Sequence, residues 1–263
     1  MTEAVVLCSI DSRSVATVTL NRPAVNNAYN ADLVQGLLDT FAALAADPQV
    51  RVVVIRGNGL HFQAGADLKW LQEVGRLDAA ANHAASTATA AAMRGLNEMR
   101  KPTVALVHGF CVGGGTGIVA SCDIVIAERG ASFAISEARW GMAATIIFPQ
   151  LVAAMGIRNV RRYALSGERF DARRAEVLGL VHEVCQPGQL DASAAPIIDA
   201  LLKIAPDAQA LSKLSALRCA DALIDDELFA RLVDEHATKR RSAEAAEGLA
   251  SFAEKREAAW YRA

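Results

Sequence analysis

A cluster of glycines in the middle of the chain could bind a negative charge through its backbone. Residues 113–123 read GGGTGIVASCD and follow the apolar, strand-like run TVALVHGFCV. A strand that leads into glycines and then a helix presents unpaired N–H groups, and the helix dipole adds to their positive potential. Three anions could use these groups: a nucleotide phosphate, a dinucleotide, or a carbonyl oxygen that becomes negative during a reaction.

The sequence disfavours the first two anions. No Gly-Lys-Ser/Thr follows, which excludes a Walker loop in practice. Gly115, Gly117 and Ala120 match the dinucleotide pattern G-x-G-x-x-A. However, the next strand begins near Asp123, which leaves too short a helix for a βαβ unit. The oxyanion interpretation is therefore favoured.

An oxyanion site needs a second loop that supplies another N–H group. The segment LHFQAGADLKW, at residues 60–70, follows the strand-like run VVVIRG. Its Ala64–Gly65–Ala66 turn permits close approach of the backbone, and Asp67 can open a helix. Either loop alone could be an ordinary tight turn, but the two together indicate a site.

Six apolar runs alternate with segments of helical periodicity, as in an α/β fold. Expected helices start at Asn30 and Asp171, each a suitable N-cap, the second ending at Gly179; another covers residues 82–100. Beyond residue 191 we expect only helices, starting near residues 193, 206 and 225, the last reaching the chain end. The sequence thus predicts an α/β core over residues 1–190 and a helical region over residues 191–263. The expected strands are VVLCSI, VATVTL, VVVIRG, TVALVHG, DIVIAE and LVHEVC.

Composition excludes several other classes of protein. The chain has 263 residues, a net charge of −2 and 52% hydrophobic residues, so no basic surface for nucleic acid or anionic lipid is indicated. Its first residues lack the basic region of a secretory signal, and no apolar run is long enough to span a membrane. Five cysteines without metal-ligand spacing predict free thiols in the cytoplasm and no metal site.

Seven segments in chain order resemble the crotonase, or enoyl-CoA hydratase/isomerase, family. The resemblance implies a β-β-α spiral core and a helical C-terminal region that forms a homo-trimer or hexamer. It also implies an acyl-CoA substrate, which brings coenzyme A with it, and no separate cofactor. The segments are NRPAVNNAYN, FQAGADL, HGFCVGGG, SCDIVIA, ASFAISEARWG, GERFDARRAEVLGLVHEV and EGLASFAEKR.

The resemblance also implies which residues form the site. The backbone N–H groups of Ala66 and Gly114 would hold the thioester oxygen. Phe252 and Lys255 match positions that reach the coenzyme A of a neighbouring subunit. The remaining substrate-binding positions are Ala64, Asp67, Leu68, Trp70, Gly113, Gly117 and Trp140, of which the two tryptophans would wall the acyl pocket.

A carboxylate is needed to move the proton on the carbon next to a thioester. Hydratases of the resembled family carry two glutamates, of which one matches Glu137 in FAISEARWG. The other falls at Gly117, which has no side chain. Glu137 is therefore the expected acid/base, and its apolar surroundings should raise its pKa.

Hydration of an enoyl-CoA is the favoured activity. The segments SEARWG, AATIIFP and RRYALSGERF, together with Gly117, resemble a bacterial branch that hydrates methylglutaconyl- or isohexenylglutaconyl-CoA. Such substrates carry a second carboxylate, for which Lys69 and Arg139 are candidate partners.

A double-bond isomerase that uses Glu137 alone and a non-catalytic acyl-CoA binder are the alternatives. One animal relative binds RNA through a lysine-rich helix, but residues 30–49 here contain no lysine or arginine, so we expect no nucleic-acid partner.

Overall fold

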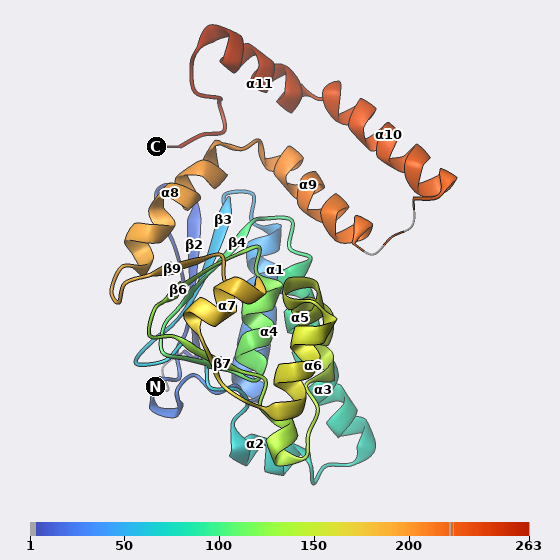
Figure 1. The fold of residues 1–263 in the computed structure, drawn as a ribbon. Coiled ribbons are helices and arrows are strands. Elements are labelled where there is room, and N and C mark those ends of the chain that lie inside the picture. The colour runs from blue at the N-terminus through green and yellow to red at the C-terminus, as the bar shows by residue number, and fades with distance from the viewer. Residues whose placement is uncertain (1–3, 221, 223, 263) are drawn as a thin grey trace.

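The six expected strands form one sheet in the order β1-β2-β3-β4-β6-β9 (Figure 1). The computed structural model describes residues 4–220, 222 and 224–262. Every neighbouring pair in this sheet is parallel except β1 and β2, which are antiparallel. The strands are Val6–Ile10 (β1), Val15–Leu20 (β2), Val52–Gly57 (β3), Thr103–Val107 (β4), Ile124–Glu128 (β6) and Glu183–Cys185 (β9).

Both faces of this sheet are covered along its strands β3, β4 and β6, whereas β1 is largely exposed. Side chains alternate between the two faces of a strand. On β3, Val53 and Ile55 face the larger core, and Val52 and Val54 face a smaller one. Helix α8, Leu190–Lys203, closes the smaller core with Leu190, Ala194 and Leu202. Burial on both faces explains why β3, β4 and β6 read as continuous apolar runs rather than as alternating patterns.

Seven helices of the described chain come before β9, and several pack over the larger core. Asn30 accepts a hydrogen bond from the Leu33 N–H (3.1 Å), and Asp171 accepts one from the Arg174 N–H (2.7 Å), so both expected N-caps are confirmed. Gly179 ends its helix in the left-handed conformation, also as expected. The helices are Ala31–Ala46 (α1), Leu68–Val74 (α2), Ala79–Asn97 (α3), Gly114–Ser121 (α4), Phe148–Met155 (α5), Ile157–Ser166 (α6) and Ala172–Leu178 (α7).

A second, three-stranded sheet was not predicted as a separate element. Its strands are Phe110–Val112 (β5), Ser132–Ala134 (β7) and Phe170–Asp171 (β8), in the order β5-β7-β8. The chain passes from β4 to β5 before α4, and from β6 to β7 before the next helices, so it visits each sheet in turn. This is the β-β-α repeat that the family resemblance implied. Short 3-10 turns occur at Pro23–Val25, Glu137–Trp140 and Thr145–Ile147.

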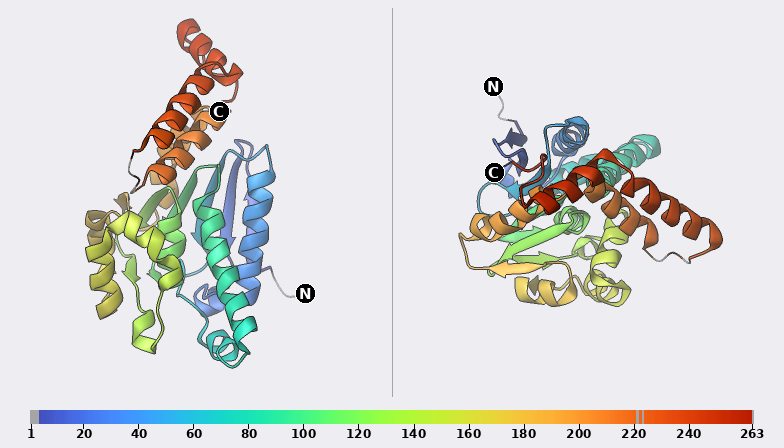
Figure 2. Two further views of the ribbon diagram at one scale, coloured as in Figure 1. Left: turned by 90° about the vertical axis from the view of Figure 1, so that its right-hand side faces the viewer. Right: turned by 90° about the horizontal axis from the view of Figure 1, so that it is seen from above.

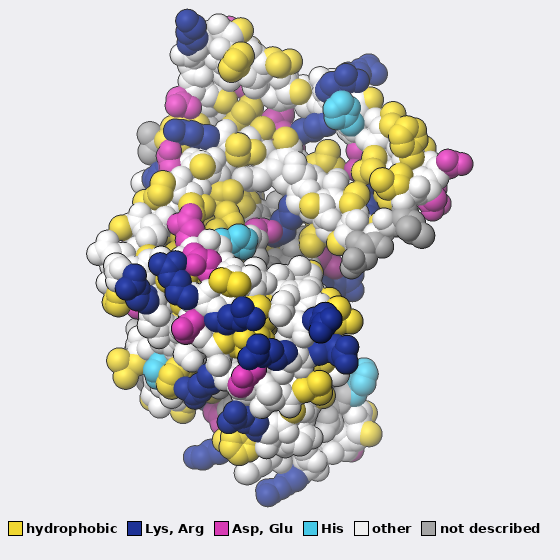
Figure 3. Space-filling view, viewed as in Figure 1, with side chains coloured by type: hydrophobic (Ala, Val, Ile, Leu, Met, Phe, Trp, Pro, Cys, Tyr) yellow, Lys and Arg dark blue, Asp and Glu magenta, His cyan; other side chains and the backbone are white. Residues whose placement is uncertain are grey.

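Three further helices extend away from the sheets (Figures 1 and 2). They are Pro206–Cys219 (α9), Asp226–Arg240 (α10) and Ala243–Glu254 (α11). The prediction of one long terminal helix was wrong, because the Ser242 side chain accepts a hydrogen bond from the Ala245 N–H (3.1 Å) and starts a new helix. Hydrophobic side chains are exposed on α10 (Figure 3), including Phe229 at 61%. No helix in the described residues is long and apolar enough to cross a membrane.

Candidate active site

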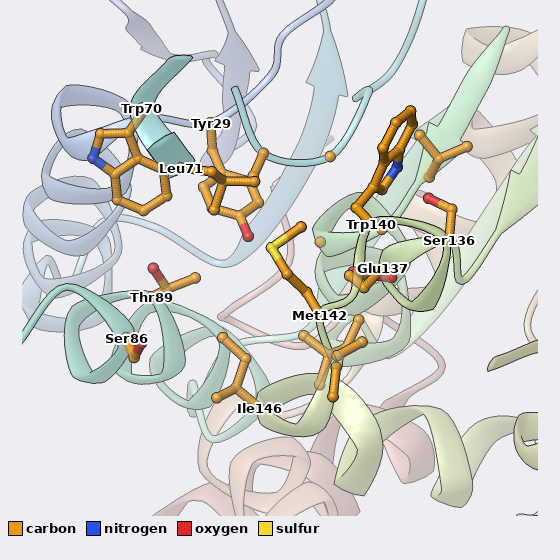
Figure 4. Close-up of a pocket in the computed structure, with 18 of the residues that line it drawn as sticks. Tyr29, Trp70, Leu71, Ser86, Thr89, Ser136, Glu137, Trp140, Met142 and Ile146 are labelled. Atoms are coloured by element: carbon orange, nitrogen blue, oxygen red, sulfur yellow. The ribbon is translucent and has the colours of Figure 1, made fainter. Parts of the chain in front are cut away.

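A cavity of about 670 Å³ lies where the two glycine-containing loops meet. Its wall also includes α3 and the segment from Ser136 to Ile147, and Figure 4 shows many of its side chains. The sequence-predicted residues that line it are Ala64, Ala66, Leu68, Trp70, Gly113, Gly114, Glu137 and Trp140. The fold therefore brings both expected loops and the expected carboxylate to one place.

The first loop turns the N–H group of Ala66 away from its neighbouring strand segment. Tyr29 pairs with Ala66 as an isolated parallel bridge: the Tyr29 N–H donates to the Gly65 carbonyl and the Asp67 N–H donates to the Tyr29 carbonyl, both at 2.9 Å. Ala66 lies between the two residues that bond to Tyr29, and in such a bridge the N–H of this middle residue points away from the partner segment. Within the described residues the Ala66 N–H donates no hydrogen bond.

Two buried amide side chains hold this loop. Gln63 donates to the Gly65 carbonyl (2.8 Å) and accepts from the Gly65 N–H (2.7 Å), and Gly65 adopts a φ of +85° that favours glycine. Asn27 donates to the carbonyls of Asn58 and His61, both at 2.8 Å. These contacts tie the segment before Tyr29 to the loop that carries Ala66.

The second loop places Gly114 at the first position of α4. A helix has no internal partner for its first N–H groups, and across the residues described here the Gly114 N–H donates no hydrogen bond. A Cβ atom on Gly114 would lie 2.5 Å from the Tyr29 ring, so only glycine fits there. A Cβ on Gly113 would lie 3.4 Å from the Gly65 Cα, which shows that the two loops are in contact.

Glu137 begins the 3-10 turn after β7 and faces the second loop. Its Oε1 lies 3.0 Å from the position that a Cβ on Gly113 would occupy. Its Oε2 is buried and has no hydrogen-bond partner in the described part of the chain. Burial raises the pKa of the Glu137 carboxyl above its ordinary value, as expected from the sequence. A carboxyl in this state can both donate and accept a proton.

Four expected site residues do not line this cavity. Asp67 caps α2 through the Lys69 N–H (3.1 Å) and forms an ion pair with Arg22 (3.1 Å). Gly117 faces Ile147, whose Cγ2 would lie 2.3 Å from a Cβ at that position. Phe252 is 86% exposed on α11, and Lys255 follows at the end of that helix.

Of the two candidate cations for a second substrate carboxylate, Arg139 lines the cavity and Lys69 does not. Sequence reasoning did not single out Tyr29, which lines the cavity, or Gln63, which holds its first loop. The signal for Gln63 was a lone amide between Phe62 and the Ala64–Gly65–Ala66 turn. Tyr29 stood in the NNAYN run, with no acidic, basic or nucleophilic residue beside it to suggest chemistry.

Comparison with known proteins identifies the family. Residues 11–263 match the enoyl-CoA hydratase/isomerase family. The mevalonyl-coenzyme A hydratase sidH of Aspergillus fumigatus is 33% identical over 258 residues, which are 97% of this chain and 94% of that protein. A crystal structure of an enoyl-CoA hydratase from Shewanella pealeana superposes with a TM-score of 0.94 at 34% identity, covering 97% and 96% of the two chains. The chain belongs to the crotonase family and has its fold.

The family comparison does not by itself separate two reactions. A peroxisomal Δ(3,5)-Δ(2,4)-dienoyl-CoA isomerase of Arabidopsis thaliana is also similar, with 28% identity over 226 residues, covering 82% of this chain and 81% of that protein. Hydratases and an isomerase thus both resemble this chain. The choice between the reactions depends on the side chains of the cavity.

Proposed function

We propose that this protein adds water across the α,β double bond of an acyl-CoA thioester. The observation that carries the proposal is the Glu137 carboxylate, whose buried Oε2 has no hydrogen-bond partner, beside two N–H groups, of Ala66 and Gly114, that donate no hydrogen bond within the described residues. The two N–H groups would bind the thioester oxygen as it becomes negative. Each donor of this kind is typically worth roughly 3–4 kcal/mol in the transition state.

Glu137 would carry out both proton transfers of the reaction. The carboxylate accepts a proton from water as the water oxygen bonds to the β-carbon, and the electrons of the double bond move to the thioester oxygen. The protonated Glu137 then gives that proton to the α-carbon, and the electrons return to re-form the carbonyl. The sum is one water added, with the protein unchanged.

For the substrate, we propose a branched ester of the glutaconyl type. Apolar side chains of Trp70, Leu71, Met142 and Ile146 line the cavity and suit a branched chain (Figure 4). Arg139 lines the same cavity and would pair with the second carboxylate. Arg169 also lines it, stacked over Phe110 at 4.5 Å, and adds to the positive charge there.

We also propose that the C-terminal helices assemble a trimer or hexamer. Exposed apolar side chains on α10 and α11, such as Phe229 and Phe252, favour burial against another copy. In that assembly Phe252 and Lys255 would reach the coenzyme A of a neighbouring subunit. Light scattering during size-exclusion chromatography tests this, and a monomer at micromolar concentration would contradict it. A cytoplasmic location stays a prediction.

The first experiment is to incubate the protein with 3-methylglutaconyl-, crotonyl- and 3-hexenoyl-CoA and to follow the products by mass. We expect the first ester to gain the mass of one water fastest. Glu137→Gln should lower that rate roughly 10²- to 10⁴-fold, whereas Glu73→Gln, on the exposed face of α2, should leave it unchanged. Equal rates on crotonyl-CoA would reject the glutaconyl substrate.

A double-bond isomerase is the second candidate, because one carboxylate is enough to move a proton between two carbons. An unchanged mass with a shifted double bond on 3-hexenoyl-CoA, and no hydration of any ester, would establish it. A protein that binds these esters but turns over none of them would be a non-catalytic binder.

A further inference from the structure

The α4 surface beside the reacting atoms is covered by two side chains from other segments. Positions 114 and 117 are three residues apart and share one face of the helix. The Tyr29 ring packs on Gly114, and Ile147 packs on Gly117. Both side chains line the cavity. Of the two side chains that cover this face of α4, Ile147 is apolar. The Tyr29 hydroxyl is therefore the polar group that this pair presents to a substrate.

Tyr29 is fixed more firmly than its place in a loop would suggest. Its backbone forms both hydrogen bonds of the bridge that orients Ala66. Its ring packs against Gly114 and meets the Trp70 ring edge to face, with centroids 5.6 Å apart. The residue therefore contacts both loops that supply the N–H groups, and its hydroxyl position is determined by both.

Figure 4 shows the hydroxyl of Tyr29 pointing into the cavity, and Glu137 lines the same cavity. Burial, and then the charge of Glu137, raises the pKa of Tyr29 to about 12. The phenol is therefore neutral at physiological pH and can donate or accept a hydrogen bond, but it is not a base. Thr89, which also lines the cavity, already donates its hydroxyl hydrogen to the Ala85 carbonyl (3.0 Å).

We propose that the Tyr29 hydroxyl holds the water molecule that Glu137 deprotonates. The inference rests on the proposed hydration, in which one carboxylate must both activate water and protonate the α-carbon. Tyr29 keeps its own proton throughout and supplies the second polar contact that fixes the water over the β-carbon. Tyr29 thus supplies a polar contact near the reaction, where Gly117, at the position of the second glutamate of the resembled hydratases, has no side chain to do so.

Tyr29→Phe tests the proposal because it removes the hydroxyl and retains the ring that packs on Gly114 and Trp70. We expect kcat for hydration to fall roughly 10- to 100-fold, with KM changed by less than about twofold because the thioester contacts remain. Deuterium exchange at the α-carbon of butyryl-CoA requires Glu137 and the oxyanion contacts but no attacking water. We expect that exchange to stay within about threefold of the wild-type rate.

The outcomes separate this role from the alternatives. An equal fall in hydration and exchange would make Tyr29 a structural support for the two loops and overturn the proposal. Unchanged hydration would also overturn it. Tyr261→Phe is the matched control, since that hydroxyl donates to Asp199 (2.7 Å) outside the cavity, and both rates should be unchanged. If the wild-type protein hydrates no ester, the proposed function fails and the inference fails with it.

Discussion

The loop at residues 63–66 is held by hydrogen bonds of the Gln63 and Asn27 side chains, whereas the loop at residues 113–116, which has one hydrogen bond from the Thr116 hydroxyl to the Gly113 carbonyl, depends on glycines that let other side chains pack against its backbone. In the first, Gln63 satisfies both polar groups of Gly65, and Asn27 binds two carbonyls nearby. In the second, glycines let other residues approach, with the Tyr29 ring against Gly114 and Gln63 against Gly115. One loop can therefore be damaged by deleting atoms and the other by adding them.

The two loops also depend on each other at one point. A Cβ atom on Gly115 would lie 2.6 Å from Gln63 Oε1, the same atom that accepts from the Gly65 N–H. The packing of the second loop thus limits the position of the side chain that supports the first. A larger residue at Gly115 should therefore affect both sources of N–H groups together.

Gly115→Ala should have the largest effect. The added methyl group cannot fit without moving Gln63 Oε1, which breaks the hydrogen bond to Gly65 and shifts both loops. Displacement of catalytic groups by about 1 Å can cost about 10²-fold in rate, and we expect a loss of at least this order in kcat/KM on the best ester. Steady-state kinetics with a thermal unfolding curve would measure it.

The control for that variant is Gly95→Ala. Gly95 is exposed on α3, and a Cβ there would meet nothing within 4 Å. Alanine should raise the free energy of unfolding by roughly 0.5–1 kcal/mol without changing activity. If Gly115→Ala retained wild-type kcat/KM, the coupling between the loops through Gln63 would be wrong.

Gln63→Leu should have a smaller effect on activity, because it removes support from one loop only. The Gly65 N–H would lose its buried partner, and the Gly65 carbonyl would keep only the Tyr29 N–H, at a cost of roughly 1–3 kcal/mol in the free energy of unfolding. We expect kcat to fall about tenfold, a loss equivalent to about 1.4 kcal/mol in the barrier. Urea unfolding and initial rates would measure both, and Gln49→Leu, at an exposed loop, should change neither. A fall as deep as that of Gly115→Ala would remove the distinction between the loops.

Gly117→Ala should reduce stability more than activity. Alanine normally stabilises a helix interior relative to glycine, but here its Cβ would lie 2.3 Å from Ile147 Cγ2. We expect a loss of roughly 1–3 kcal/mol in the free energy of unfolding from overpacking. In the double variant with Ile147→Ala the clash is absent. The double variant should therefore lose at least about 1 kcal/mol less in the free energy of unfolding than the sum of the two single-variant losses. Additive losses in a urea-unfolding cycle would show that Gly117 and Ile147 are not coupled.

The features that could be predicted from the sequence are those that depend on residues close together in the chain. The apolar runs of the large sheet, the N-caps Asn30 and Asp171, and the start of α4 all depend on local patterns, and they were predicted. The small sheet was missed because strands of two or three residues, such as β8 at Phe170–Asp171, have no periodicity of their own. The break at Ser242 was missed because the helical pattern continues on both sides of it.

The same distinction applies to the residues of the cavity. Its glycines stood out because they cluster, and Glu137 was found through a family resemblance rather than through its spacing. Tyr29 and Gln63 act on groups that are distant in the sequence, since Tyr29 packs on Gly114 and Gln63 lies against Gly115. Contacts of this kind exist only after the two loops have been brought together.

The smallest expected effect is on the pH dependence of stability, and it follows from a comparison of Glu137 with Gln63. These two side chains have equal length and lie at the same pair of loops. Gln63 has partners for both polar atoms, but the Oε2 of Glu137 has none among the described residues. Burial raises the pKa of Glu137 above its ordinary value. The folded protein therefore holds this proton more tightly than the unfolded chain, and the stability it contributes is present at low pH and lost as pH rises through the raised pKa.

Glu137→Gln removes that dependence because an amide does not ionise. The variant should match the wild type in urea unfolding near about pH 4 and become the more stable of the two near about pH 8. Glu73→Gln, on exposed α2, should show no such divergence. A Glu137→Gln variant that is less stable than the wild type at about pH 8 would mean that the carboxylate is satisfied in the folded protein. Glu137 would then be a structural group like Gln63, and not a carboxylate kept without a partner for chemistry.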